Sequence, residues 1–168
     1  MKKTIHILYW IILCFYLFLL VDTVFFARDS MRSVNFVPFH MISQNILVDD
    51  GVQFKWADMN VWGNILMFVP AGIYIMLHGK SLSVWRNLLH IIGLSITIEV
   101  IQFICARGAT DIDDVILNAI GGFLGIIVYM VFAKVFKSRE RIKMAIAVLS
   151  LIVGIPIVIL TIILAIAN

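Results

Sequence analysis

The chain has 168 residues, of which 62% are hydrophobic and only 14% are charged. Soluble domains are about 45–50% apolar, so this composition excludes an ordinary soluble globule and predicts a membrane protein. The net charge of +3 is small. No basic stripe with interleaved aromatic residues occurs, and this excludes nucleic acid as a partner.

Several apolar runs are long enough to cross a bilayer, whose hydrocarbon core of about 30 Å requires about 20 helical residues. We predict an all-α fold: a polytopic membrane helical bundle of about five transmembrane helices, forming a single integral membrane domain over residues 1–168. We interpret the first run as an uncleaved N-terminal anchor helix. The predicted spans are Ile5–Phe26, Val61–His78, Val84–Ala106, Asp114–Phe136 and Met144–Ala167.

The positions of Lys and Arg predict the orientation in a bacterial cell membrane, because cytoplasmic loops are enriched in these residues. A cytoplasmic N-terminus places most of them inside: Lys2, Lys3, Lys80, Arg86, Lys134, Lys137, Arg139, Arg141 and Lys143. The remaining four lie outside among aspartates: Arg28, Arg32, Lys55 and Arg107. The C-terminus is then extracytoplasmic.

The long first outer loop contains an apolar piece, Asn35–Ile42, that is too short to span. Pro38 restricts Val37 to extended geometry, which argues against one unbroken helix there. We predict a re-entrant or interfacial segment in this loop.

Polar residues occur within the second, third and fourth predicted spans. More of them lie in the corner between the third and fourth spans. An isolated charge near the bilayer centre costs about 3 kcal/mol on insertion scales, so such residues usually face a protein interior and mark functional sites. We predict that they converge at the extracytoplasmic end as a ligand-binding site. The candidates are Asn64, Glu99, Gln102, Arg107, Asp111, Asp113, Asp114 and Asn118.

The third and fourth spans are predicted to form a tight hairpin. Asp114 and Asn118 share a helical face with Gly121 and Gly125, and a GxxxG pair allows two helices to approach closely. Thr110, three residues before Asp113, resembles the start of a capping box for the fourth span.

The ordered polar residues resemble those of the VanZ-like family. The motifs are N-x-x-P-F from Asn35, N-x-x-x-F-V-P-A-G from Asn64, S-x-x-x-E-x-x-Q from Ser95, and R-x-x-x-D-x-D-D-x-x-x-N-x-x-G from Arg107. The resemblance covers about residues 35–132 and leaves the C-terminal helix 144–167 outside. It implies a multi-pass membrane protein that contributes to resistance to the lipoglycopeptide teicoplanin or modulates the cell envelope.

Three interpretations of the polar cluster remain open. In the first, an outward-facing pocket binds a membrane lipid, a lipophilic glycopeptide or a lipid-linked cell-wall precursor, with Arg107 contacting an anionic group. In the second, a membrane-embedded enzyme acts on lipid-linked cell-wall intermediates, with Glu99 or Asp114 as a general base beside Arg107. In the third, the cluster is architectural: Arg107 pairs with Glu99 or Asp111, and Asp114 bonds Asn118. In a metal-dependent version of the second interpretation, the D-x-D-D run of Asp111, Asp113 and Asp114 holds a divalent cation. No cofactor and no metal site is otherwise predicted.

Overall fold

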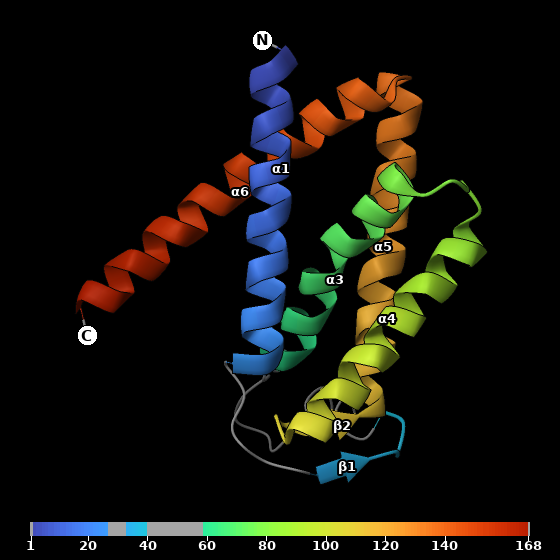
Figure 1. Ribbon diagram of the computed structural model, residues 1–168, viewed down its shortest axis with the longest axis vertical. Coiled ribbons are helices and arrows are strands. Elements are labelled where there is room, and N and C mark those ends of the chain that lie inside the picture. The colour runs from blue at the N-terminus through green and yellow to red at the C-terminus, as the bar shows by residue number, and fades with distance from the viewer. Residues whose placement is uncertain (1, 27–32, 40–58, 168) are drawn as a thin grey trace, which may run out of the picture. The chain divides into compact units, whose positions relative to one another are not determined.

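The computed structural model describes residues 2–26, 33–39 and 59–167. These residues are predominantly helical (Figure 1), which confirms the predicted all-α class. The elements are α1 (Lys2–Val21), the π-helical turn η1 (Asp22–Phe26), β1 (Ser33–Asn35), α3 (Met59–His78), α4 (Val84–Cys105), β2 (Ala109–Asp111), α5 (Ile112–Phe136) and α6 (Arg139–Ala167).

Four of the described helices are long and apolar enough to cross a membrane. They match the first four predicted spans and cover His6–Phe26, Asn60–His78, Val84–Cys105 and Ile112–Phe136. The fifth predicted span also forms a helix, but α6 begins at Arg139, before the predicted start at Met144. A membrane crossing by α6 stays a prediction.

The chain divides into two compact units, residues 19–131 and residues 1–18 with 132–168. In the second of these, Tyr9 is buried and the Nζ atom of Lys143 lies 5.8 Å from the centre of its ring. Ile142 and Ile146 are buried in the same unit. Its core therefore forms where the first turns of α6 meet α1.

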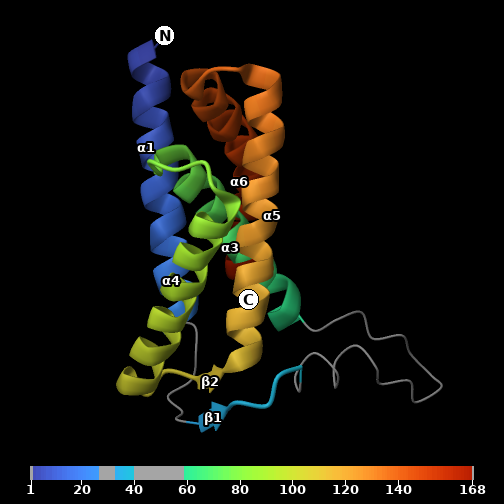
Figure 2. The same ribbon diagram turned by 90° about the vertical axis from the view of Figure 1, so that its right-hand side faces the viewer.

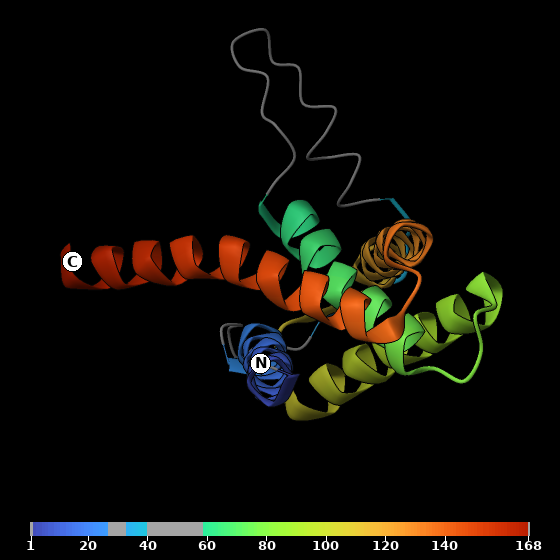
Figure 3. The same ribbon diagram turned by 90° about the horizontal axis from the view of Figure 1, so that it is seen from above.

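In the 19–131 unit, glycines bring the backbones of α3 and α5 into direct contact. Viewed from above, α5 is seen nearly end-on, and α3 and α4 are inclined to it (Figure 3). A Cβ atom would collide with a backbone carbonyl of the facing helix at three glycines: Gly121 with that of Ile65, Gly125 with that of Val69, and Gly72 with that of Gly122. Gly121 and Gly125 are four residues apart, about one turn of helix, and so are Ile65 and Val69. The two contacts therefore repeat in register along α5 and α3.

The glycine face was expected to pack within the α4–α5 hairpin, but Gly121 and Gly125 contact α3 instead. The glycine that faces α4 is Gly122, where a Cβ atom would meet the side chain of Ile91. Adjacent positions on a helix point about 100° apart, so neighbouring glycines serve two different partners. The three helices therefore pack around one another.

A two-stranded parallel sheet lies beneath the ends of α4 and α5 as drawn in Figures 1 and 2. β1 pairs with β2 so that Ser33 faces Ala109 and Asn35 faces Asp111. The sequence did not predict these strands. The described part of the apolar loop piece, Asn35 to Phe39, leaves β1 and enters a turn, and residues 40–42 lie outside the described residues. A re-entrant or interfacial placement of this piece stays a prediction.

The glycine contacts generate a prediction with an internal control. We expect Gly125→Ala to lower the stability of the protein in detergent by about 1–3 kcal/mol, because the added methyl group forces α3 and α5 apart. Gly63→Ala and Gly93→Ala should raise stability slightly, since nothing lies within 4 Å of a Cβ at either position and alanine is the better helix former. Thermal unfolding monitored by circular dichroism measures all three. Equal effects at Gly125 and Gly93 would contradict the close packing.

Candidate functional site

The corner between α4 and β2 is a sharp reversal. Ala106 ends α4 in the left-handed conformation (φ 52°), and its N–H donates to the carbonyls of Gln102 and Phe103. The N–H of Arg107 also donates to the carbonyl of Gln102, at 2.9 Å. These bonds satisfy carbonyl groups that the last turn of a helix leaves unpaired. Gly108 follows with φ 84°, so the chain turns within three residues and enters β2.

Asp111 joins the strand pair to α5. It precedes the first residue of α5, and its Oδ1 accepts a hydrogen bond from the N–H of Asp113 at 2.9 Å, as a helix N-cap does. The cap is therefore Asp111, and the predicted capping role of Thr110 is wrong. The Thr110 hydroxyl instead donates to the backbone carbonyl of Glu99 at 3.4 Å.

Asn35 of β1 reaches the same carboxylate. Its Nδ2 donates to Oδ1 and Oδ2 of Asp111 at 3.2 and 3.1 Å, across the strand register. The N–H of Phe39 donates to Oδ1 of Asp113 at 2.5 Å. Phe39 has φ 63°, a conformation that costs a residue with a side chain about 1–2 kcal/mol. The bond to Asp113 helps to hold this turn against α5.

Asn35 is a site residue whose role the sequence does not predict, although it belongs to a family motif. The only signal was the N-x-x-P-F spacing. Its Oδ1 accepts from the N–H of Val37 at 3.1 Å, so the same side chain also shapes the turn before Pro38.

Glu99 supports the corner from α4. Its Oε2 accepts a hydrogen bond from the N–H of Asp111 at 3.2 Å, and the side chain is 4% exposed. The spacing of Ser95, Glu99 and Gln102 puts all three on one buried face of α4.

Further along the helices, buried polar side chains pair between different helices. Nδ2 of Asn64 in α3 donates to Oδ1 of Asp114 at 2.5 Å, and Nδ2 of Asn118 donates to Oγ of Ser95 at 3.0 Å. Asp114 and Asn118 were expected to bond each other. Instead, Asp114 bonds Asn64 and Asn118 bonds Ser95. Nε2 of Gln102 donates to the carbonyl of Val24 in η1, at 2.8 Å.

The structure brings the predicted site residues together, but most of them are buried in the protein interior and do not line an open surface. Seven of the eight have side chains that are at most 7% exposed: Asn64, Glu99, Gln102, Asp111, Asp113, Asp114 and Asn118. We call these seven the polar core. An outward-opening pocket above them stays a prediction.

Arg107 is the exception among the predicted site residues. It is half-buried, and within the described residues its guanidinium forms no ion pair and no hydrogen bond. The expected ion pair with Glu99 or Asp111 is therefore wrong: Oε2 of Glu99 accepts from the N–H of Asp111, and the Asp111 carboxylate accepts from Asn35. The arginine lies at the corner that the polar core holds in place.

Two acceptors in the polar core lack partners. Among the described residues, Oε1 of Gln102 and Oδ1 of Asn118 are buried and accept no hydrogen bond. Leaving such an atom unsatisfied costs about 1–3 kcal/mol. Over the same part of the chain, no group of three or more His, Cys, Asp or Glu side chains is arranged to hold a metal ion.

The family model described as VanZ/LLP1 matches residues 5–133, which include every residue of the polar core and Arg107. The chain belongs to the VanZ/LLP1 family. Polar residues of the motifs that suggested this family meet at the corner and in the interior of this VanZ/LLP1 chain.

Among curated proteins, the VanZ/LLP1 chain is similar to "Protein VanZ" of Enterococcus faecium. The two are 37% identical over 91 residues, which make up 53% of this chain and 56% of that protein. The chain therefore spans just over half the length of this relative. No solved structure matches the chain.

The geometry makes Asp111 the residue whose loss should loosen the corner most. We expect Asp111→Ala to destabilise the protein by about 2–3 kcal/mol, because both the cap of α5 and the Asn35 contact are lost. Asp111→Asn keeps an oxygen for the cap and should cost less. Thermal unfolding in detergent measures the effect.

The control for Asp111 is Asp22→Ala, which removes an exposed carboxylate from η1. Its effect should stay within about 0.5 kcal/mol. Equal melting temperatures for the Asp111 and Asp22 variants would show that the corner does not depend on Asp111.

Proposed function

We propose that this membrane protein contributes to lipoglycopeptide (teicoplanin) resistance or modulates the cell envelope, without catalysing a reaction. Its site is the α4–β2 corner, on the side that the distribution of Lys and Arg predicts to be extracytoplasmic. The ligand is a membrane lipid or a lipophilic glycopeptide, and Arg107 contacts its anionic group. The observation that carries the proposal is Arg107 itself, a half-buried residue next to the hydrogen-bonded polar core. Within the described residues its guanidinium has no hydrogen-bond or ion-pair partner.

Two features support this role for Arg107. Guanidinium presents paired N–H donors that match the oxygens of phosphate and carboxylate groups. The residue also follows directly on the left-handed end of α4, where the bonds to Gln102 fix its backbone. Because the backbone is already fixed, binding costs only the conformational entropy of the arginine side chain, which favours affinity.

In this proposal, the polar core positions the corner and does not itself contact the ligand. Asp111 and Glu99 hold β2 against α4, and Asn64 with Asp114 joins α3 to the start of α5. Removing one member takes a hydrogen bond from its buried partner, so the core acts through the stability and geometry of the corner.

The proposed role of Arg107 predicts a loss of function without a loss of fold. Cells expressing Arg107→Gln should lose resistance to teicoplanin down to the level of cells without the protein. The purified variant should keep its stability within about 0.5 kcal/mol, since no described residue depends on the guanidinium. Drug susceptibility, with membrane levels checked by immunoblot, measures the outcome.

Arg139→Gln is the matched control, because it removes an exposed guanidinium at the start of α6. It should leave resistance unchanged. Full resistance in well-expressed Arg107→Gln cells would contradict the proposal.

The enzymatic alternative stays a prediction with its own test. It requires the purified protein to turn over lipid-linked cell-wall intermediates, and it requires Glu99→Gln to abolish that turnover. Turnover of this kind by the wild-type protein would replace the non-catalytic proposal.

A further inference from the structure

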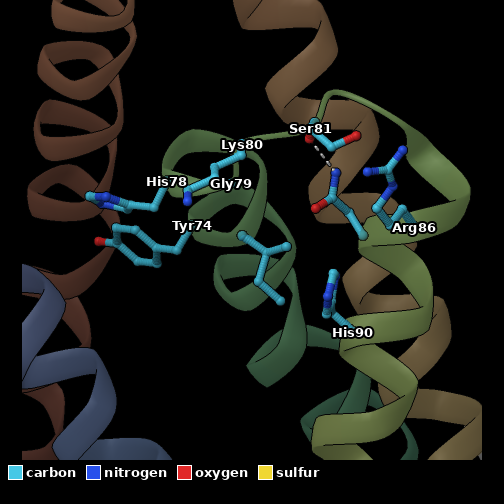
Figure 4. Close-up of a pocket in the computed structure, with 9 residues that line it drawn as sticks. Tyr74, His78, Gly79, Lys80, Ser81, Arg86 and His90 are labelled. Atoms are coloured by element: carbon cyan, nitrogen blue, oxygen red, sulfur yellow. Dashed lines mark hydrogen bonds between the residues drawn. The ribbon is translucent and has the colours of Figure 1, made fainter.

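A second polar region lies at the other ends of α3 and α4, away from the polar core. There the C-terminal end of α3, the link 79–83 and the first turns of α4 surround a hollow of about 640 Å³. Figure 4 shows Tyr74 and His78 on one side, Arg86 and His90 on the other, and Lys80 between them. None of the residues of the polar core lines it.

The hollow is positively charged, and its cations are not neutralised locally. Lys80 and Arg86 are exposed, and within the described residues neither side chain forms an ion pair or a hydrogen bond. The sequence has no Asp or Glu between Met59 and Ile98, so α3, the link and the lining part of α4 supply no carboxylate. His78 and His90 add two imidazoles to the lining.

The shape of the link is fixed by a buried amide. Asn87 is 2% exposed, and its Nδ2 donates to the carbonyls of Ser81 and Ser83 at 2.8 and 2.9 Å and lies 3.0 Å from Sδ of Met76. Gly79 fits only without a side chain, because a Cβ atom would press on the carbonyl of Ile75. The backbone between the two cations is therefore held in one conformation before any ligand arrives.

The position of the hollow along the helices points to a lipid. It lies where the candidate span Asn60–His78 ends and the candidate span Val84–Cys105 begins. The termini of spanning helices lie at the depth of the lipid head groups. Leu82 and Trp85 are 62% and 68% exposed beside the cations. Exposed tryptophan at such an end is typical of the membrane interface.

We propose that this hollow binds the phosphate group of an anionic phospholipid. Arg86 and Lys80 contact the phosphate oxygens, and Leu82 and Trp85 contact the glycerol and the first carbons of the acyl chains. The absence of carboxylates favours a head group with a net negative charge over a zwitterionic one. The site does not depend on the function proposed for Arg107.

A positive charge at this end of the helices would also be expected if Lys80 and Arg86 only oriented the protein in the membrane. The two explanations differ in where they require the two cationic side chains to lie. An orienting charge acts wherever it lies on that side, whereas a phosphate site requires these two side chains in this hollow.

Native mass spectrometry of the full-length protein in detergent separates them. The probes are phosphatidylglycerol, phosphatidylcholine and inorganic phosphate, each titrated into delipidated protein. The wild type should retain phosphatidylglycerol in preference to phosphatidylcholine. The Lys80→Gln/Arg86→Gln variant should bind phosphatidylglycerol at least about tenfold more weakly, because two charge-assisted contacts are lost.

The matched control is Lys134→Gln/Arg139→Gln, which removes two cations of the same predicted membrane side without touching the hollow. It should bind phosphatidylglycerol as the wild type does, and so should the charge-preserving Lys80→Arg/Arg86→Lys variant. The single variant Arg86→Gln distinguishes lost binding from a folding defect. It should melt at the wild-type temperature and still bind phosphatidylglycerol more weakly than the wild type.

Equal affinity for phosphatidylglycerol in the two glutamine double variants would overturn the proposal. So would equal affinity of the wild type for phosphatidylglycerol and phosphatidylcholine. Inorganic phosphate that displaces the lipid and binds equally well would confirm a phosphate site but overturn its assignment to a lipid.

Discussion

The rest of the 19–131 unit depends on the way Asp114 is accommodated inside an apolar helix. A carboxylate in a membrane-spanning segment must find hydrogen-bond donors within the protein, because lipid offers none. The amide of Asn64 supplies one from α3. This contact joins α3 to the start of α5, and the pairs Asn118 with Ser95 and Asp111 with Glu99 connect α5 and β2 to α4.

Close packing and polar pairing support each other along α3 and α5. The glycines let the two backbones touch, and that distance allows a short side chain such as Asn64 to reach Asp114. Between helices in a membrane there is little hydrophobic driving force, so van der Waals contact and interhelical hydrogen bonds carry the association. The same arrangement leaves Arg107 outside the hydrogen-bonded core, which is why it is the residue proposed to meet a ligand.

The sequence predicted the helices and the set of converging polar residues, because apolar run length and intramembrane charge are strong local signals. It did not predict the partners. Asp114 was expected to bond Asn118, one turn away, but the carboxylate turns to Asn64, fifty residues earlier in the chain. The β1–β2 pair was missed for a related reason: three-residue strands carry no periodic pattern, and their pairing joins segments far apart in sequence. From the sequence, Lys80 and Arg86 indicate only the orientation of the chain, because the hollow that they line forms where two helices meet.

The most direct test of the central claim is a double-mutant cycle on Asn64 and Asp114, with stability measured by thermal unfolding in detergent. If the two side chains satisfy each other inside the protein, Asn64→Ala and Asp114→Ala should each be costly, and the double variant should cost less than their sum by at least about 1 kcal/mol. Strictly additive costs would show that the two groups do not interact, and would contradict a polar core that joins α3 to α5.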